Sequence, residues 1–507
     1  MLALPFAAAL IPLAVTPVMP LIDYYDHLAR FYVLSHLGPA SPLQANYLAH
    51  WSLMPDIGLD VIATPLLALL PPLIAAHVLA VLILLMLYGG LLYFNFVLTG
   101  RTPFLAALLM APLLYSYVWN WGFANFLLAL GLAFWAAGWW LAHRNHPLKA
   151  TPAAAVFALV IFLAHGVAFL LYGIMLGLLE IGLALQQRPL EWRVLAGRLA
   201  LLLLQAVIPV LLFLQWQHGR GDDGTGVSQS GFALHNYVQG LTFRPGHMGL
   251  RRLQTILRVE EGPSYWFDAV TLILQALAVG FLVWRRQLAF VRPAWLLAAA
   301  AVLMIALVPS KMFGVDYIAD RMPLFAVLVL LGAMSATGVA LDARARIAIA
   351  LLALIAIARI GAIAYDWHGY GARYREFQSA ASHLPRGALT LEIPIGAGRH
   401  ETNIPRCEMY RGLLVTQFGQ MVPLFAFNGQ HPIRLAGRLK QSAEFLRNNP
   451  VTVREKIDDY GEYMKTAAPT GLDYFLLCNS QLLGAPVPAN FPLVTRTPHF
   501  TLVRVHG

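Results

Sequence analysis

The residues whose types and spacing best suit catalysis form a group of acidic and basic side chains near the N-terminus. Asp23, Asp26, His27 and Arg30 are spaced i, i+3, i+4 and i+7, so a helix would place all four on one face. One interpretation is a self-neutralised stripe, in which His27 and Arg30 satisfy both carboxylates. The other is a general base, because partial removal of a carboxylate from water raises its basicity and an adjacent cation tunes it. The position directly after an apolar segment favours the second interpretation, with Asp23 or Asp26 as the base.

The stretch that follows this group ends with two further acidic residues. Asp56 follows Pro55 in a polar segment and is predicted to join the site. Asp60 directly precedes an apolar run that begins at Val61, and aspartate is a preferred residue at the start of a helix. We therefore predict a site residue at Asp56 and a helix cap at Asp60.

A second cluster with both signs of charge covers residues 309–321. Asp316 and Asp320 could compensate Lys311 and Arg321 internally. Alternatively, Lys311 or Arg321 binds an anionic phosphate, as both side chain types commonly do. The sequence leaves these two interpretations open.

The composition shows which elements must position these groups. The chain has 507 residues, of which 59% are hydrophobic and only 12% charged, and its mean hydropathy is +0.64. Soluble domains are about one-quarter charged, so water is not the solvent for most of this chain. The net charge of +10 comes from basic residues that stand singly between apolar runs. This pattern indicates membrane topology and excludes a nucleic-acid-binding face.

Apolar runs long enough to cross a bilayer occur along the first three-quarters of the chain. The run at residues 152–187 is too long for one span and has a natural break at His165-Gly166, so we predict two short spans there. The total is then about eleven spans in an all-α polytopic membrane domain. The other predicted spans are residues 2–20, 72–98, 103–118, 122–142, 199–216, 265–284, 293–309, 321–341 and 345–366.

The distribution of basic residues supports this count. With a break at His165, the basic connectors fall on one side, and the opposite connectors around Asn120 and His165 carry no Lys or Arg. Cytoplasmic loops collect Lys and Arg, so the N-terminus is predicted inside and the C-terminus outside. The basic connectors hold Arg101; Arg144 and Lys149; Arg188, Arg193 and Arg198; Arg285, Arg286 and Arg292; and Arg344 and Arg346.

Three outer loops and the tail then hold the polar clusters, namely residues 21–60, 217–264, 310–320 and everything beyond the last span. The second of these loops contains a Gly- and Asp-rich stretch at 219–226, which could cover a cleft. It also contains a basic, amphipathic stretch at 247–258, which suits a helix lying in the membrane interface.

The tail, residues 367–507, is predicted to be a small extracytoplasmic α/β or α+β domain. It holds both cysteines of the chain, Cys407 and Cys478, without the spacing of a zinc site. A disulfide fits an oxidising compartment, whereas two unrelated buried thiols are the alternative. The strand-like runs are 388–395, 474–478 and 500–505, and the helix-like runs are 375–383 and 453–466.

This order of features resembles the GT-C superfamily of integral-membrane glycosyltransferases, which includes protein O-mannosyltransferases, oligosaccharyltransferases and the lipid A aminoarabinose transferases. The resemblance covers the whole chain in layout and depends locally on Asp23-Tyr-Tyr-Asp26-His27 and the loop that follows. The WWDYG motif of oligosaccharyltransferases does not occur in the sequence, which disfavours peptide N-glycosylation.

The resemblance implies transfer of a sugar from a polyprenyl-phosphate donor to an acceptor on the outer face of a membrane. Asp23 or Asp26 matches the catalytic position of the family, and Lys311 or Arg321 would neutralise the leaving phosphate. The further substrate- or phosphate-binding candidates are His27, Arg30 and Asp56. The implied partners are the lipid-linked sugar donor, a glycan, lipid or protein acceptor, and membrane lipids. The implied location is the bacterial inner membrane with a periplasmic C-terminal domain.

Other functions fit the same layout. A lipid or polysaccharide transporter or flippase also has many spans, but it more often places ionisable groups at mid-membrane than in outer loops. A catalytically silent assembly protein would share the architecture. No cofactor is indicated, although the acidic pair Asp23 and Asp26 could hold a divalent cation such as Mg²⁺.

Overall fold

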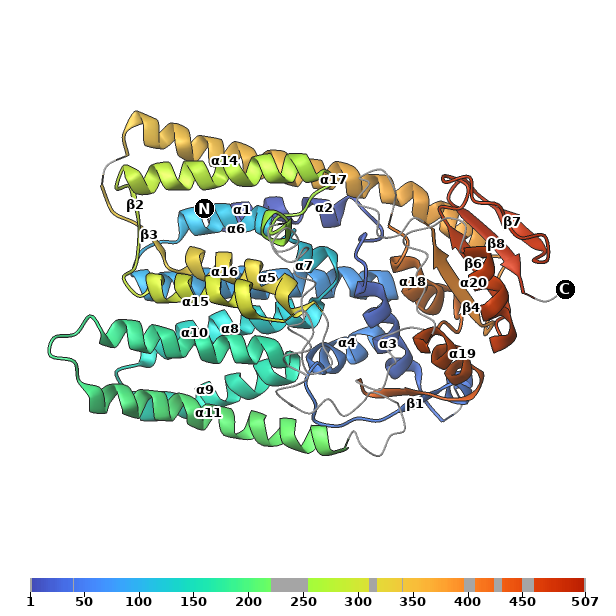
Figure 1. Cartoon of the computed structure of the whole chain (residues 1–507), viewed down its shortest axis with the longest axis horizontal. Coiled ribbons are helices and arrows are strands. Elements are labelled where there is room, and N and C mark those ends of the chain that lie inside the picture. The colour runs from blue at the N-terminus through green and yellow to red at the C-terminus, as the bar shows by residue number, and fades with distance from the viewer. Residues whose placement is uncertain are drawn as a thin grey trace.

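Long helices form one body and a small domain with a β-sheet packs against one end of it (Figure 1). The computed structural model describes residues 2–39, 41–219, 254–309, 317–339, 341–395, 406–423, 431–448 and 460–505. Each predicted span contains a helix or a helix pair, although the span predicted at 321–341 ends early, because α16 stops at Gly332 and a short strand follows. Seven helices of the described residues are long and apolar enough to cross a membrane. These seven are α5 (Pro72–Thr99), α8 (Ala124–His143), α9 (Pro147–Ala164), α10 (Gly166–Ala184), α11 (Trp192–Gly219), α14 (Tyr265–Trp284) and α17 (Ala343–Ala381).

The remaining predicted spans are shorter helices packed among the long ones. α1, α2, α6 and α16 pack against α5 or α17, and α15 packs against α16 and α10, so helices make up most of the described part of this domain. The predicted fold class, a polytopic helical domain followed by a small C-terminal α/β domain, is confirmed. These helices are α1 (Ala3–Ala9), α2 (Ile11–Ala14), α6 (Phe104–Leu113), α15 (Ala294–Leu307) and α16 (Ile318–Gly332).

The break at His165 is present. α9 ends at Ala164, α10 begins at Gly166, and His165 between them is extended, with φ −167° and ψ 119°. The Nδ1 atom of His165 accepts a hydrogen bond from the backbone N–H of Val167 at 3.2 Å, which caps the start of α10. The prediction of two short spans in place of one long one is therefore confirmed.

The basic connectors lie together at the end away from the C-terminal domain. The buried carboxylate of Glu180 binds Arg144 at 3.0 Å and Arg198 at 3.3 Å, which joins two of these connectors. Strands β2 (Leu288–Phe290) and β3 (Met334–Ala336) pair antiparallel and join two more, far from the C-terminal domain (Figure 1). The charge asymmetry along the sequence is therefore an asymmetry between the two ends of the molecule.

Because cytoplasmic loops collect Lys and Arg, we expect the C-terminal domain to lie outside the cytoplasm. A C-terminal alkaline phosphatase fusion, active only in an oxidising compartment, should be active in cells. A C-terminal green fluorescent protein fusion should be dark when exported through the general secretion route. The opposite pair of results would mean that the basic connectors face outward.

The C-terminal domain contains a four-stranded sheet in the order β4-β6-β8-β7. β4 runs parallel to β6, and the other pairs are antiparallel. Each of the three predicted strands is present, since β4 is Thr390–Pro394, β6 is Tyr474–Cys478 and β8 is Phe500–Arg504; β7 (Leu493–Arg496) was not predicted. The helices beside the sheet are α18 (Met409–Phe418), α19 (Gly437–Asn448) and α20 (Tyr460–Ala467).

One helix crosses the predicted domain boundary. α17 runs without interruption from Ala343 to Ala381, so the expected separate helix at 375–383 is the end of the last span. The boundary predicted between residues 366 and 367 lies inside this helix. A continuous helix is a stiff connection, so the domain is held at a fixed place relative to the spans.

Cys407 and Cys478 form a disulfide, with a Cα–Cα distance of 6.0 Å. Cys407 stands two residues before α18, and Cys478 is the last residue of β6. The bond therefore ties the start of α18 to the central strands of the sheet. The disulfide interpretation is confirmed, and the alternative of two unrelated buried thiols is wrong.

Removing this disulfide should destabilise the C-terminal domain. Closing a loop across a sequence separation of 71 residues contributes about 4 kcal/mol on the chain-entropy model. We expect Cys407→Ser together with Cys478→Ser to lower the thermal unfolding temperature of the purified protein. Recovery of two free thiols from wild-type protein prepared without reductant would contradict the assignment.

Candidate functional site

The first acidic group lies where the C-terminal domain meets the membrane domain. Asp23 directly precedes α3 (Tyr24–His36), and α3 packs on α18 of the C-terminal domain. The contact is so close that a Cβ at Gly412 of α18 would lie 2.0 Å from the carbonyl oxygen of Tyr25. Only glycine fits at this position, so α18 is pressed directly onto the first turn of α3.

A second contact joins the first outer loop to the C-terminal domain. Strand β1 (Tyr47–Ala49) of that loop pairs antiparallel with β5 (Ile433–Leu435), and the backbone N–H of His50 donates to the carbonyl of Pro432 at 2.9 Å. Figure 1 shows β1 beside α19, at the C-terminal domain. The loop and the domain therefore form one structural unit around α3.

Arg30 and Asp60 form a bidentate ion pair in which both side chains are fully buried. Arg30 Nε lies 2.7 Å from Asp60 Oδ1, and Arg30 Nη2 donates to Asp60 Oδ2 at 2.9 Å. Asp60 lies inside the first turn of α4 (Gly58–Leu69), so the prediction that it caps this helix is wrong. Arg30 binds Asp60, and the pair fixes α3 to α4, so we assign Arg30 a structural role in place of phosphate binding.

His27 contacts the same arginine. Arg30 Nη1 lies 2.9 Å from His27 Nδ1, which must accept this hydrogen bond because guanidinium has no acceptor. Burial, and then the charges of Arg30 and Arg321, hold the pKa of His27 well below its ordinary value. His27 is therefore neutral and does not compensate an aspartate. The interpretation of a self-neutralised stripe is wrong, because the partners of its charged members lie on other elements.

Asp26 pairs with an arginine of the C-terminal domain. Its side chain is fully buried, and its Oδ2 lies 2.9 Å from Arg411 Nη2 of α18. Burial raises the pKa of Asp26 to about 7, which Arg411 and the N–H of Gly412 oppose. A guanidinium this close already neutralises the carboxylate, which disfavours a divalent cation shared between Asp23 and Asp26.

Asp23, unlike Asp26, remains partly accessible. Its backbone N–H donates to the carbonyl of Trp121 at 2.9 Å, which anchors it to the turn before α8. Burial, followed by the charge of Asp26, raises the pKa of Asp23 to about 8, while Arg411 and Arg321 lower it. A carboxylate with this environment can take up a proton near neutral pH, as a general base requires.

Arg321 of α16 is the cation of the 309–321 cluster that the structure describes. It is 4% exposed, and its Cζ lies 4.0 Å from the ring centroid of Phe123 and 5.2 Å from that of Phe126. Its Nη1 lies 2.8 Å from His165 Nε2, and Asp56 Oδ1 lies 3.6 Å from the same nitrogen. Arg321, Asp56 and His165 thus come together from three separate segments of the chain.

Several of the predicted features lie outside the described residues. These are Lys311 and Asp316, the Gly- and Asp-rich stretch at 219–226, and the interfacial helix at 247–258 except for its last five residues. Asp320 is buried and accepts a hydrogen bond from Thr255 at 3.5 Å.

The other outer loops join the same region through charged side chains. Arg258 pairs with Glu261, and its guanidinium lies over the ring of Tyr117 at 4.5 Å. Arg406 of the C-terminal domain donates to the carbonyl of Pro20 at 2.9 Å and lies 3.7 Å from Glu261. Arg406 therefore links the C-terminal domain to the segment before Asp23 and to the segment that holds Glu261.

Arg359 of α17 is buried with two carboxylates. Its Nε lies 2.9 Å from Glu260 and its Nη2 lies 2.9 Å from Asp268. Arg359 is therefore paired with buried carboxylates and does not extend to the surface. The cluster fixes α14 to α17.

Two residues of this region were not predicted as site residues. His165 was predicted only as the break between two spans, and its partner Arg321 lies 156 positions further along the chain. Arg411 lies in a helix that the sequence did not indicate. Neither residue could be recognised from its sequence neighbours, because the side chain that each one contacts lies far away in the chain.

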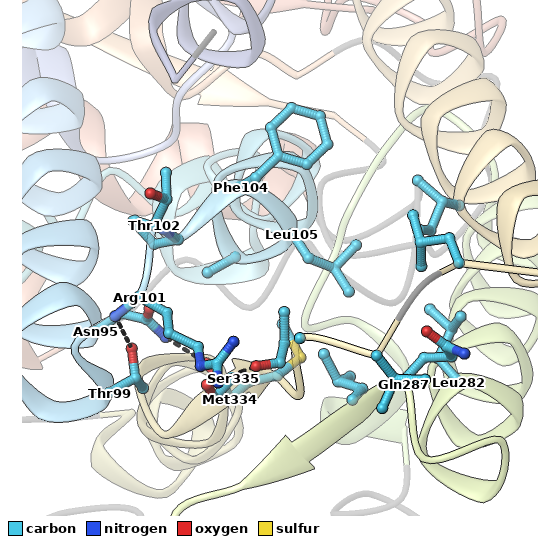
Figure 2. Close-up of a pocket in the computed structure, with 18 residues that line it drawn as sticks. Asn95, Thr99, Arg101, Thr102, Phe104, Leu105, Leu282, Gln287, Met334 and Ser335 are labelled. Carbon is cyan, nitrogen blue, oxygen red and sulfur yellow. Dashed lines mark hydrogen bonds between the residues drawn. The ribbon is translucent and has the colours of Figure 1, made fainter.

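A cleft of about 240 Å³ lies at the other end of the molecule, between the end of α5, β2 and β3 (Figure 2). Its lining is mostly apolar, with Arg101, Gln287 and Ser335 among its polar residues. Asn95 donates from Nδ2 to the carbonyls of Leu331 at 2.9 Å and Met334 at 2.7 Å, which closes its base. The cleft belongs to the basic connectors and is separate from the aspartates.

No family model matches the sequence, and no curated protein matches it. Among solved structures, the chain is similar to ArnT from Cupriavidus metallidurans in the apo state, with a TM-score of 0.51 and 14% identity over 100% of this chain and 98% of that one. The same protein bound to undecaprenyl phosphate gives a TM-score of 0.49 with 15% identity, over 100% and 98% of the two chains. An oligosaccharyltransferase from Archaeoglobus fulgidus tethered to an acceptor peptide gives 0.46 with 13% identity, over 95% of this chain and 69% of that chain.

ArnT is a GT-C glycosyltransferase, and the match to its apo structure extends over nearly the whole of both chains. The two chains therefore share an overall fold over nearly their whole lengths. The protein described here therefore has the same overall fold as ArnT, the GT-C fold.

Proposed function

We propose that this protein is a glycosyltransferase that moves a sugar from a polyprenyl-phosphate donor to an acceptor hydroxyl at the outer face of the membrane. The observation that carries the proposal is the environment of Asp23, a partly accessible carboxylate with a pKa raised to about 8 and within electrostatic reach of Arg321. A base and a cation near one another are what this reaction needs. The GT-C fold supports the same class of reaction.

In the proposed step, the carboxylate of Asp23 removes the proton of the acceptor hydroxyl while the hydroxyl oxygen bonds to the anomeric carbon of the sugar. The bond from that carbon to the phosphate oxygen breaks, and the oxygen keeps the electron pair. Arg321 faces the charge that develops on the phosphate. Asp23 is preferred to Asp26 because Asp26 is fully buried and already paired with Arg411.

The direct test is sugar transfer by the purified protein in liposomes that contain a polyprenyl-phosphate sugar. The product would be a glycosylated acceptor together with free polyprenyl phosphate. A flippase would instead move the lipid-linked sugar between leaflets without consuming it. An assembly protein would do neither, and both outcomes would contradict the proposal.

Arg321 provides a second test. We expect Arg321→Gln to lower kcat by about 10²–10³-fold, the usual cost of removing one group that stabilises developing negative charge. Arg321→Lys should keep part of the activity because it keeps the charge. Inhibition by polyprenyl phosphate should weaken in Arg321→Gln and should not change in Arg438→Gln, which alters an exposed arginine of the C-terminal domain. Unchanged inhibition in Arg321→Gln would remove Arg321 from the phosphate site.

A further inference from the structure

The ion pair behind Asp23 connects the C-terminal domain to the chemistry of the site. Asp26 lies one helical turn beyond Asp23, and its carboxylate faces α18, where Arg411 binds it at 2.9 Å. Both aspartates are on one element and the arginine is on another, more than 380 positions along the chain. The charge environment of Asp23 therefore depends on how α18 packs on α3.

The seating of α18 is fixed in three ways. Gly412 allows its backbone to touch the carbonyl of Tyr25, and no other residue type fits at that distance. The disulfide at Cys407 ties the start of the helix to the sheet. The β1–β5 pairing holds the first outer loop against the same domain. The fixed packing of α18 on α3 thus places Arg411 beside Asp26.

Several other charged groups surround the Asp26–Arg411 pair, so the loss of either partner changes the electrostatic environment of Asp23. The groups that face Asp23 and Asp26 are Arg411 and Glu408 at the start of α18, Glu392 of β4 and Arg321 of α16. A fully buried carboxylate without a cation is costly, so Asp26 needs Arg411 to stay ionised. Asp26 raises the pKa of Asp23, and Arg411 lowers it.

We propose that Arg411 of the C-terminal domain is a positioning residue of the transfer site, which holds Asp26 in a closed ion pair behind Asp23 and thereby controls whether Asp23 carries a proton. The inference rests on the proposed function in taking Asp23 as the base. It gives the C-terminal domain a role in the chemistry beyond covering the outer face. Arg411 touches Asp26 and acts on Asp23 through its field.

The test measures the protonation of Asp23 without relying on activity. Dicyclohexylcarbodiimide labels protonated carboxyl groups, so the pH at which labelling of the Asp23 peptide falls by half, read by mass spectrometry, reports its titration. In the wild-type protein this midpoint is expected near pH 8. Arg411→Gln should move it up by about 1 unit, and Asp26→Asn should move it down by about 1 unit. Arg411→Lys should stay near the wild type, as should the control Arg438→Gln.

Opposite shifts in the two single variants are the decisive result, because a loss of packing would not change sign between them. The double variant Arg411→Gln with Asp26→Asn leaves no unpaired charge buried. It therefore provides a folded protein for the test if Arg411→Gln alone misfolds. Its midpoint should fall below the wild type but less than that of Asp26→Asn. Unmoved midpoints, or shifts in the same direction in both single variants, would overturn the inference. The expected shifts without sugar transfer in any variant would support it and refute the proposed function.

Discussion

Replacing Asp23 with Asn is expected to lower kcat for sugar transfer by about 10²–10⁴-fold, the usual contribution of a general base. Asn keeps the size of the side chain and its hydrogen-bonding groups, but it cannot accept the acceptor proton. The protein should still fold, because Asp23 is partly accessible and its anchoring contact to Trp121 is made by the backbone. Thermal unfolding and elution volume should match the wild type.

The wild-type enzyme should show a matching dependence on pH. A base acts only when it is deprotonated, and the pKa of Asp23 is raised from its ordinary value to about 8. kcat/KM should therefore rise with pH and reach half of its maximum near pH 8, and this rise should be absent from the residual activity of Asp23→Asn. Asp26→Asn should retain transfer, with the rise displaced to lower pH. If Asp26→Asn abolished transfer and Asp23→Asn retained it, the assignment of the two aspartates would have to be exchanged.

Replacing Asp60 with Ala is expected to lower the free energy of unfolding by about 3–5 kcal/mol, because it leaves the guanidinium of Arg30 buried without its counterion. Both side chains of this pair are fully buried, and two hydrogen bonds at 2.7 and 2.9 Å join them. The measurement is thermal unfolding in detergent, together with the yield of folded protein. Arg30→Met with Asp60→Leu, which removes both charges, should recover much of the loss.

An exposed ion pair of the same chain serves as the control. Lys440 and Glu444 lie four residues apart on α19, 3.8 Å from each other, with 62% and 52% of their side chains exposed. Such pairs contribute about 0.5 kcal/mol, so Glu444→Ala should change stability very little. Equal effects of Asp60→Ala and Glu444→Ala would mean that the Arg30–Asp60 pair is not buried in the folded protein.

The sequence by itself determined the helical membrane domain, because a span needs about 20 apolar residues and this requirement is local. It also predicted the break at His165, since two spans there were needed to keep the basic connectors on one side. Three strands of the C-terminal domain followed from short apolar runs, whereas the placement of both cysteines in that domain left the disulfide as one of two interpretations until the structure showed it.

The ion-pair partners of the charged residues could not be predicted from the sequence. The spacing correctly placed Asp26, His27 and Arg30 on one helix that Asp23 directly precedes, but their mutual neutralisation was the wrong expectation. An ion pair forms with whichever opposite charge the packing brings near, and local spacing contains no information about α4 or α18. Asp60 was interpreted as a cap for the same reason, because its partner lies 30 positions earlier.

The choice between the two aspartates was likewise left to the tertiary structure. Asp23 and Asp26 are chemically identical and three residues apart, so the sequence could not rank them. The close contact between Gly412 and Tyr25 buries one of them against Arg411 and leaves the other partly accessible. Burial and the field of neighbouring charges set the basicity of a carboxylate, and both are properties of the packed molecule that no local run of residues specifies.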